Sequence, residues 1–314
     1  MKTYLEVTII MATFNRAHFI AETLLSVQNQ TFKNWECLII DDGGTDNTKD
    51  IIAPFIDGDD RFRFFIRPPL YTKGLPGCRN YGLDLSKGTS IIFFDDDDIV
   101  HPLNLELCVE ALDKTQLDFC RYERAVFMGA FNYKFDLSKQ YSSFYIDRTA
   151  IASILNNQLP FNSCAVLWKK LCFQDQRFDE TLMFAEEWEL YSRIIMTGLK
   201  GVSIEKCLFY GRKHDKSNTG EYYLNNPIRR NSHAEAVVLV MVNLRKESLL
   251  TDTLVRYLVV QSYYLRECNS FPKLIDATHF SGIQKVKWQI FYKMLPLRLS
   301  ITRFKVKIRN LLRI

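Results

Sequence analysis

Four consecutive carboxylates, Asp95-Asp96-Asp97-Asp98, follow the apolar run Ser90–Phe94. Adjacent anions repel one another, so a folded chain needs a reason to hold them together. One interpretation is a solvated acidic loop, with Asp98 capping a helix that begins near Pro102. The other is a site for a hard divalent cation, which prefers oxygen ligands. By itself the stretch favours the solvated loop slightly, because charge runs usually lie at the surface.

The elements before these aspartates alternate between apolar strands and amphipathic helices. Buried strands are predicted at 7–12, 35–40, 61–66 and 90–94, with a helix after each of the first three. This alternation predicts an α/β fold with a doubly wound, mostly parallel, Rossmann-like sheet. Ligands bind such sheets beyond the carboxyl ends of the strands. We therefore expect three polar clusters to share one rim: Thr13–Arg16, Asp41–Asp42 and Asp95–Asp98. This expected convergence favours the cation site over the solvated loop.

The pattern is less regular after Pro102. We predict a strand at 119–128 that is not parallel to the others, and further strands at 163–168 and 202–210. Glu186 and Glu187 begin a predicted helix that continues to Met196. Acids in a first helical turn interact favourably with the macrodipole, so a purely structural role is one explanation for them. From about Pro227 the spacing of apolar residues is helical almost throughout.

Composition sets broad bounds on the protein class. The chain has 314 residues, of which 47% are hydrophobic and 25% charged, as in ordinary globular proteins. No apolar run is long enough to span a membrane, and the N-terminus lacks the apolar centre of a signal peptide. We therefore expect a cytoplasmic protein. The eight cysteines are scattered without a CxxC pair, which predicts reduced thiols in the core.

Basic residues are concentrated near the C-terminus. Residues 277–314 contain nine Lys or Arg and no Asp or Glu. Apolar residues between them suit a segment lying on an anionic membrane surface. A basic helix packed on its own domain is an equally good explanation. Nucleic acid is not an expected partner, because no nucleic-acid module is present.

Six ordered blocks resemble the inverting nucleotide-sugar glycosyltransferases of family 2, which have a GT-A fold. Together they extend from residue 7 to about 215 and leave the final hundred residues uncovered. The blocks are Val7–Arg16, Ser26–Phe32, Ile40–Asp46, Arg79–Gly82, Asp95–Ile99 and Glu186–Leu190.

The resemblance implies a domain organisation and a reaction. A GT-A domain would span 1–218, with a nucleotide-sugar half at 1–100 and an acceptor half at 101–218. Residues 219–314 would form a helical, basic appendage. The expected donor is a UDP-sugar, and the expected acceptor is a glycan or a lipid-linked glycan of the cell envelope. Such an enzyme would act in the cytoplasm or peripherally on the inner face of the membrane.

The resemblance also implies a divalent metal, Mg²⁺ or Mn²⁺. Asp97 matches the metal ligand of the family's D-x-D-D motif, with Asp95 or Asp96 assisting it or holding the donor's ribose. Asp98 would be a supporting or capping residue. His214 matches loosely a histidine that touches metal or phosphate, although a lone histidine in a basic loop is usually solvated.

The donor would contact residues on the same rim. Asp42 matches the aspartate that accepts the imide N–H of the base, and Arg79 could meet the diphosphate at a helix start. The turn containing Thr13, Asn15 and Arg16 would flank the base, and Asn15 could also cap the following helix. A turn carboxylate and a surface arginine are the alternatives for Asp42 and Arg79.

Glu187 occupies the position of the family's catalytic base, where the usual residue is Asp. Its extra methylene would move the carboxylate by about one bond length, and a misplacement of ~1 Å matters in catalysis. Glu186 is the alternative base. The departure also leaves open a catalytically inactive nucleotide-binding scaffold. A nucleotidyltransferase is a further alternative, but the turn at Thr13–Arg16 lacks the glycines of a triphosphate loop.

Overall fold

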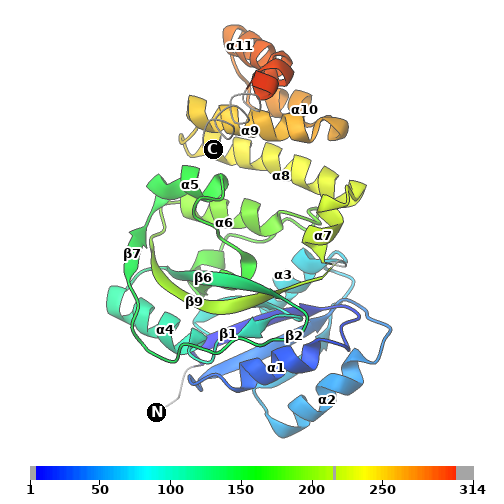
Figure 1. Ribbon diagram of the computed structural model, residues 1–314, viewed down its shortest axis with the longest axis vertical. Helices are drawn as coiled ribbons and strands as arrows, with labels where there is room; N and C mark the ends of the chain where they lie inside the picture. Colours follow the sequence, from blue (N-terminus) through cyan, green and yellow to red (C-terminus); the bar gives the residue numbers. More distant parts are fainter. Residues whose placement is uncertain (1–4, 215–216, 302–314) are drawn as a thin grey trace, which may run out of the picture. The chain divides into compact units, whose positions relative to one another are not determined.

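The computed structural model describes residues 5–214 and 217–301. It divides into two compact units, one extending to Arg229 and the other beginning at Arg230. In Figure 1 the first unit is a sheet with helices on both faces, and the second is helical. The boundary predicted after residue 218 remains a prediction.

Among the described residues, nine strands form one sheet in the first unit. Their order is β3 (Phe62–Ile66), β2 (Trp35–Asp41), β1 (Val7–Thr13), β4 (Ser90–Asp95), β8 (Val166–Lys169), β6 (Phe119–Met128), β9 (Gly201–Lys213) and β5 (Ile99–Val100), with β7 (Ser143–Ile146) paired to β9. Most paired residues lie in the parallel ladders of β1 with β2 and β4, β2 with β3, and β6 with β9. The predicted α/β class with a mostly parallel sheet is confirmed.

Alternating side chains of the central strands fill two cores on opposite faces of the sheet. Ile9 and Met11 of β1 face a core that includes α1 (Ile20–Gln28), α2 (Thr48–Gly58) and α4 (Asn104–Thr115). Ile10 faces a second core with α3 (Leu75–Leu85), α5 (Ile151–Leu155) and α6 (Glu186–Met196). The strand alternation therefore produces a three-layer unit (Figure 1).

The prediction that strand 119–128 is not parallel to the others is wrong. β8 is antiparallel both to β4 and to β6, so β6 runs in the same direction as β4. β6 also pairs in parallel with β9. Hydrophobic periodicity identifies a strand but carries no information on its direction, which explains the error.

Gly82 lets α3 pack closely against β1. A Cβ atom at this position would lie 2.4 Å from Ile10 Cγ2, closer than real side chains approach one another. Only glycine therefore permits this spacing between the helix and the strand. The close packing brings the first turns of α3, including Arg79, towards the carboxyl end of the sheet.

The described part of the C-terminal region is helical, as predicted. α7 (Asn218–Tyr223) belongs to the first unit, α8 (Pro227–Lys246) begins at its end, and the second unit continues with α9 (Asp252–Tyr264), α10 (Ser270–Ala277) and α11 (Gly282–Lys293). None of the described helices is both long and apolar enough to cross a membrane. Five of the basic residues noted above lie outside the described residues: Arg303, Lys305, Lys307, Arg309 and Arg313.

All eight cysteines are free thiols, and six of them are buried. The prediction of reduced core cysteines is confirmed.

Candidate active site

The carboxyl ends of three neighbouring strands meet at one edge of the sheet. Thr13, the last residue of β1, is paired with Asp41, the last residue of β2. Ala12 is paired with Asp95, which ends β4. The three polar clusters that follow these strands therefore share one rim, as predicted.

The turn after β1 connects two loops of this rim. Arg16 donates from Nε to Asp96 Oδ1 at 3.2 Å, and its Nη2 atom lies 3.9 Å from Asp97 Oδ2. Asn15 has a left-handed backbone, with φ of 54°, and its Oδ1 accepts the N–H of Thr45 at 2.7 Å. Asn15 thus fixes the loop after β2 and does not cap α1, which begins farther along the chain.

Asp96 and Thr13 are buried beneath this turn. Asp96 Oδ2 and Thr13 Oγ1 bond to no other described residue, although the Thr13 hydroxyl lies close enough to the Asp96 carboxyl to lower its pKa. Burial raises the pKa of Asp96 to about 7, with Arg16 lowering it and Asp97 adding to the increase. An unpaired buried polar atom is unfavourable, so a ligand that bonded to these oxygens would remove a cost.

Two residues at the end of β9 contact the aspartates. His214 Nε2 lies 2.7 Å from Asp97 Oδ2, although 117 residues separate them in the chain. The backbone N–H of Arg212 donates to Asp98 Oδ1 at 2.6 Å, and its Nε donates to the Asp97 carbonyl at 2.8 Å. Asp98 is therefore bonded to β9, and α4 has no side-chain cap at its N-terminus.

Arg79 joins the aspartate cluster to the two glutamates. Its guanidinium donates to Asp95 Oδ1 at 3.2 Å and to Glu186 Oε1 at 3.0 Å. The Arg79 side chain is only 2% exposed and lies over the Phe93 and Phe178 rings. Arg79 is therefore a buried bridge between β4 and α6, and its predicted contact with a diphosphate remains a prediction.

Glu187 lies beside Glu186 in the first turn of α6. The preceding residue, Ala185, has a left-handed φ of 63°, which turns the chain sharply into the helix. Burial, followed by the Glu186 carboxylate, raises the pKa of Glu187 to about 8, and Arg79 opposes the increase. A carboxyl with a pKa near neutral pH is suited to accept a proton from a hydroxyl group.

Asp42 is nearly buried at the end of β2. Its Oδ1 accepts hydrogen bonds from Arg67 Nε at 2.5 Å and from the Gly74 N–H at 3.2 Å. Its own N–H donates to the Thr13 carbonyl at 2.9 Å. In the part of the chain that the structure describes, all hydrogen bonds to this carboxylate use Oδ1, so Oδ2 is the oxygen that a ligand could use.

The donor atoms on the rim fit a hard divalent cation. Carboxylate oxygens of Asp95 and Asp98 lie within 4.8 Å of each other and of the Cys164 sulfur. Burial raises the pKa of the Cys164 thiol well above its usual value, so the sulfur stays protonated and is a poor ligand. The ligand atoms that remain are aspartate oxygens, among them the buried Asp96 Oδ2. Oxygen ligands suit Mg²⁺ or Mn²⁺. This cluster pairs Asp95 with Asp98, whereas the sequence resemblance pointed to Asp97.

Two residues of the site were missed by the sequence analysis. Arg67 directly follows β3, and Arg212 lies near the end of β9, whose direction matches that of β4. Each is a basic residue at the carboxyl end of a parallel strand. A basic residue at the carboxyl end of a parallel strand could have been predicted to lie on the rim. For Arg212 this was not possible, because the predicted sheet did not include β9 as a parallel strand.

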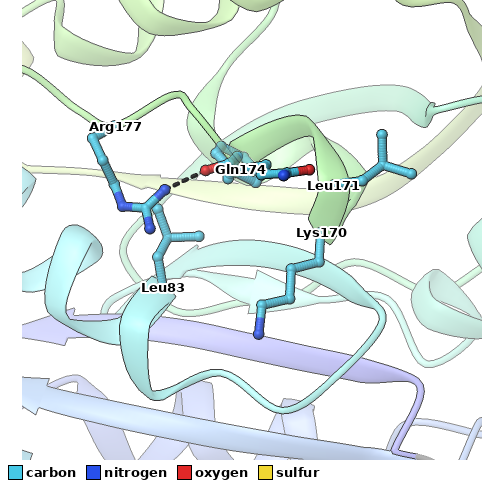
Figure 2. A pocket seen from close by; sticks show the side chains of 6 residues that line it. Leu83, Lys170, Leu171, Gln174 and Arg177 are labelled. Atoms are coloured by element: carbon cyan, nitrogen blue, oxygen red, sulfur yellow. Dashed lines mark hydrogen bonds between the residues drawn. The ribbon is translucent and has the colours of Figure 1, made fainter.

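A hollow of about 300 Å³ lies elsewhere on the first unit. Figure 2 shows its lining residues Leu83, Lys170, Leu171, Gln174 and Arg177, with Phe173 also contributing. The Lys170 N–H donates to the Thr89 carbonyl, immediately before β4 begins. The hollow is therefore at the amino end of β4, opposite the rim, and is not part of the candidate site.

A family comparison covers the first five of the six blocks that resemble family 2, whereas Glu186–Leu190 lies beyond the matched residues. The sequence profile described as "Glycosyl transferase family 2" matches residues 8–172. Over 119 residues the chain is 37% identical to the E. coli "UDP-Glc:alpha-D-GlcNAc-diphosphoundecaprenol beta-1,3-glucosyltransferase WfgD". That match covers 38% of this chain and 45% of WfgD, so the chain spans less than half of that relative's length.

Two solved structures share the fold at low sequence identity. S. aureus TarS 1-349 in complex with UDP-GlcNAc has a TM-score of 0.67 and 18% identity, covering 87% of this chain and 79% of that one. Mannosyltransferase PcManGT from Pyrobaculum calidifontis, in complex with GDP-Man and Mn²⁺, has a TM-score of 0.56 and 14% identity, covering 93% and 80%. The GT-A-like fold expected from the sequence is confirmed.

Proposed function

The chain belongs to glycosyl transferase family 2, and on that premise we propose that it transfers a sugar from a nucleoside-diphosphate donor to a glycan or lipid-linked acceptor. One observation carries the proposal. Arg79 bonds to Asp95 in the carboxylate cluster and to Glu186, which adjoins the candidate base Glu187. Metal chemistry and proton transfer would therefore take place on one rim.

The proposed donor is a UDP-sugar. Asp42 Oδ2 would accept the imide N–H of uracil, while Arg67 and Gly74 hold Oδ1. Cytosine and adenine lack an imide N–H at the matching position. Thr13, at the start of the same turn, presents a buried hydroxyl beside Asp96, and Asn15 and Arg16 keep the flanking loops in place. WfgD uses UDP-glucose by name, and TarS was solved with UDP-GlcNAc.

Asp97 and Asp95 would hold a Mg²⁺ or Mn²⁺ ion, with Asp98 close to Asp95. When bound, the ion would act as a Lewis acid that stabilises the negative charge of the departing diphosphate. His214 orients the Asp97 carboxylate through the bond at Oδ2. Arg79 orients Asp95, and Arg16 holds Asp96. PcManGT, which shares the fold, was solved with Mn²⁺.

Glu187 is the proposed general base of an inverting single displacement. Its carboxylate would take the proton of the acceptor hydroxyl while that oxygen attacks the sugar carbon from the face opposite the diphosphate. The raised pKa of Glu187 matches this task. Arg79 holds Glu186 by a hydrogen bond. The helix α6, which carries both acids, is fixed in the core by its buried face.

The proposed acceptor is a lipid-linked glycan of the cell envelope. WfgD acts by name on a diphosphoundecaprenol-linked sugar. An enzyme with such an acceptor would work in the cytoplasm and bind peripherally to the inner face of the membrane.

A donor screen tests this function. Purified protein would be incubated with Mn²⁺, a synthetic diphospholipid-linked GlcNAc acceptor and each of several UDP-, GDP- and TDP-sugars. We expect release of UDP together with a glycosylated acceptor, and inverted configuration at the transferred carbon by NMR. Pyrophosphate release from a nucleoside triphosphate would instead identify a nucleotidyltransferase. UDP binding without turnover of any donor would identify an inactive scaffold.

A further inference from the structure

A stripe of exposed aliphatic side chains extends along α11 and the helical residues that follow it. Six residues make up this stripe, three or four positions apart, and they are between 42% and 85% exposed: Ile283, Val286, Ile290, Met294, Leu297 and Ile301. Such spacing places them on one face of a helix. The Met294 N–H donates to the Ile290 carbonyl, and Arg298 donates likewise to Met294, so the helical path continues past Lys293.

The opposite face of the same helix is anchored within the second unit. Trp288 and Leu295 are each only 2% exposed. The Tyr292 ring stacks on Phe271, with centroids 3.9 Å apart. A reciprocal capping box at Ser281 and Gln284 fixes the start of the helix. The helix is thus held with its aliphatic stripe outwards, which is unusual for residues that normally prefer burial.

The charges around the stripe select the kind of partner. Lys293 and Arg298 each lie three or four positions from a stripe residue, so basic groups flank the aliphatic face. Lys287 has the same spacing but is ion-paired with Asp252 of α9. No Asp or Glu occurs in residues 277–314, which contain nine Lys or Arg. A second copy of this helix would bring like charges together. The chain's own last residues are equally basic and would also be repelled.

We propose that this stripe is a docking face for an anionic lipid bilayer, with the helix lying parallel to the surface. A bilayer offers an apolar medium to the aliphatic side chains and anionic headgroups to the basic residues beside them. A nucleic acid would satisfy only the charges. Docking would place the enzyme at the surface where the lipid-linked acceptor of the proposed function lies. The biological purpose of this docking rests on the proposed function, whereas the binding to lipid does not depend on it.

Vesicle flotation tests the docking without donor or acceptor. The full chain would be mixed with phosphatidylglycerol/phosphatidylcholine vesicles or with pure phosphatidylcholine vesicles. We expect binding to the anionic vesicles that is at least tenfold stronger than to the neutral ones and that decreases as salt increases. The double variant Ile290→Ser/Leu297→Ser should bind the anionic vesicles at least tenfold more weakly, because several CH₂ groups no longer enter the bilayer.

A matched control separates the stripe from general surface hydrophobicity. Ile290 and Leu297 are 55% and 57% exposed, and the control residues Leu171 and Leu137 are 56% and 64% exposed. Leu137→Ser/Leu171→Ser should leave vesicle binding unchanged. Circular dichroism of both double variants would verify that they fold.

Three results would overturn the proposal. These are equal binding by the stripe variant and the wild type, equal binding to neutral and anionic vesicles, and a stripe-dependent dimer in analytical ultracentrifugation. Sugar transfer to a water-soluble acceptor would be measured in parallel. A wild-type protein that transfers sugar but does not bind anionic vesicles refutes the docking alone, whereas a wild-type protein that binds the vesicles but transfers no sugar refutes the proposed function alone.

Discussion

Arg79 donates to Glu186 Oε1 at 3.0 Å, across 107 residues of sequence. The same guanidinium also binds Asp95, so one buried cation connects two acidic groups on different elements. Its contacts make Arg79 a positioning residue: it holds carboxylates in place without needing to touch the substrate.

Arg79→Met should destabilise the protein and slow transfer. The substitution would leave two carboxylates without their cation, and breaking a buried pair in this way costs about 3–5 kcal/mol in unfolding free energy. Urea unfolding measures the loss, and kcat should also decrease because the acids of α6 lose an anchor. Arg177→Met is the control: Arg177 and its partner Asp84 are both 43% exposed, and such pairs contribute less than about 1 kcal/mol. Equal effects of the two substitutions would contradict the bridge.

Glu187→Gln should lower kcat by roughly 10²–10⁴-fold, because an amide cannot accept the proton of the acceptor. In the wild type, kcat/KM should increase with pH and level off above about pH 8, where the carboxyl of Glu187 is ionised. Glu187→Asp keeps a carboxylate at the position where the family has one and should retain measurable activity. Full activity of the Gln variant would move the base elsewhere, with Glu186 as the next candidate.

Glu187 should also affect how the stability of the protein depends on pH. The pKa of Glu187 is raised from its usual value of 4.5 to about 8, so the folded state binds a proton that the unfolded state has lost in this window. Stability therefore falls as the pH rises from 4.5 to 8. Glu187→Gln removes this term, so the variant should gain stability relative to the wild type between pH 5 and 9. Chemical unfolding at several pH values checks the trend, and a constant difference between the proteins would argue against a raised pKa.

Substitution of single aspartates should identify the metal ligands. We expect Asp97→Asn and Asp95→Asn to abolish most Mn²⁺ binding in calorimetric titrations. His214→Ala should weaken it by about 10–100-fold, the usual effect of removing a partner that orients a ligand. Asp98→Asn should have a smaller effect on Mn²⁺ binding, since Asp98 Oδ1 already accepts the Arg212 N–H. If Asp98→Asn removed the metal and Asp97→Asn did not, the ligand pair would be Asp95 and Asp98.

Asp42→Asn should weaken UDP binding by about 1.5–3 kcal/mol, the contribution of a hydrogen bond to a charged group. The affinity for CDP should change less, because cytosine has no imide N–H to lose a partner. Fluorescence competition against a labelled nucleotide would give both constants. Asp59→Asn is a suitable control, because Asp59 pairs with Arg61 at the amino end of β3, away from the rim. If the affinities for UDP and CDP decreased equally, Asp42 would not be the residue that accepts the imide N–H of the nucleobase.

The sequence predicts the rim well but not the contacts across it. Strand periodicity was enough to bring Thr13, Asp42 and Asp95 to one edge, because parallel strands end together. The position of Arg79 depends on how closely α3 packs, which is determined by contacts such as that between Gly82 and Ile10. Such distances are tertiary properties and leave no periodic signal. The direction of β6 was mispredicted for the same reason, and with it the position of Arg212.

Arg212 also has a consequence for how the site forms during synthesis. Its side chain bonds to the Asp97 carbonyl, to the Gly129 carbonyl and to Glu22, and it lies over the Phe19 ring. These partners lie between Phe19 and Gly129 in the chain, and Glu22 is 190 positions from Arg212. A nascent chain could pair β1 to β4 early, yet the aspartate loop would remain unclamped until β9 had left the ribosome. The geometry of the proposed metal site would therefore form as a late folding event, after most of the core had formed.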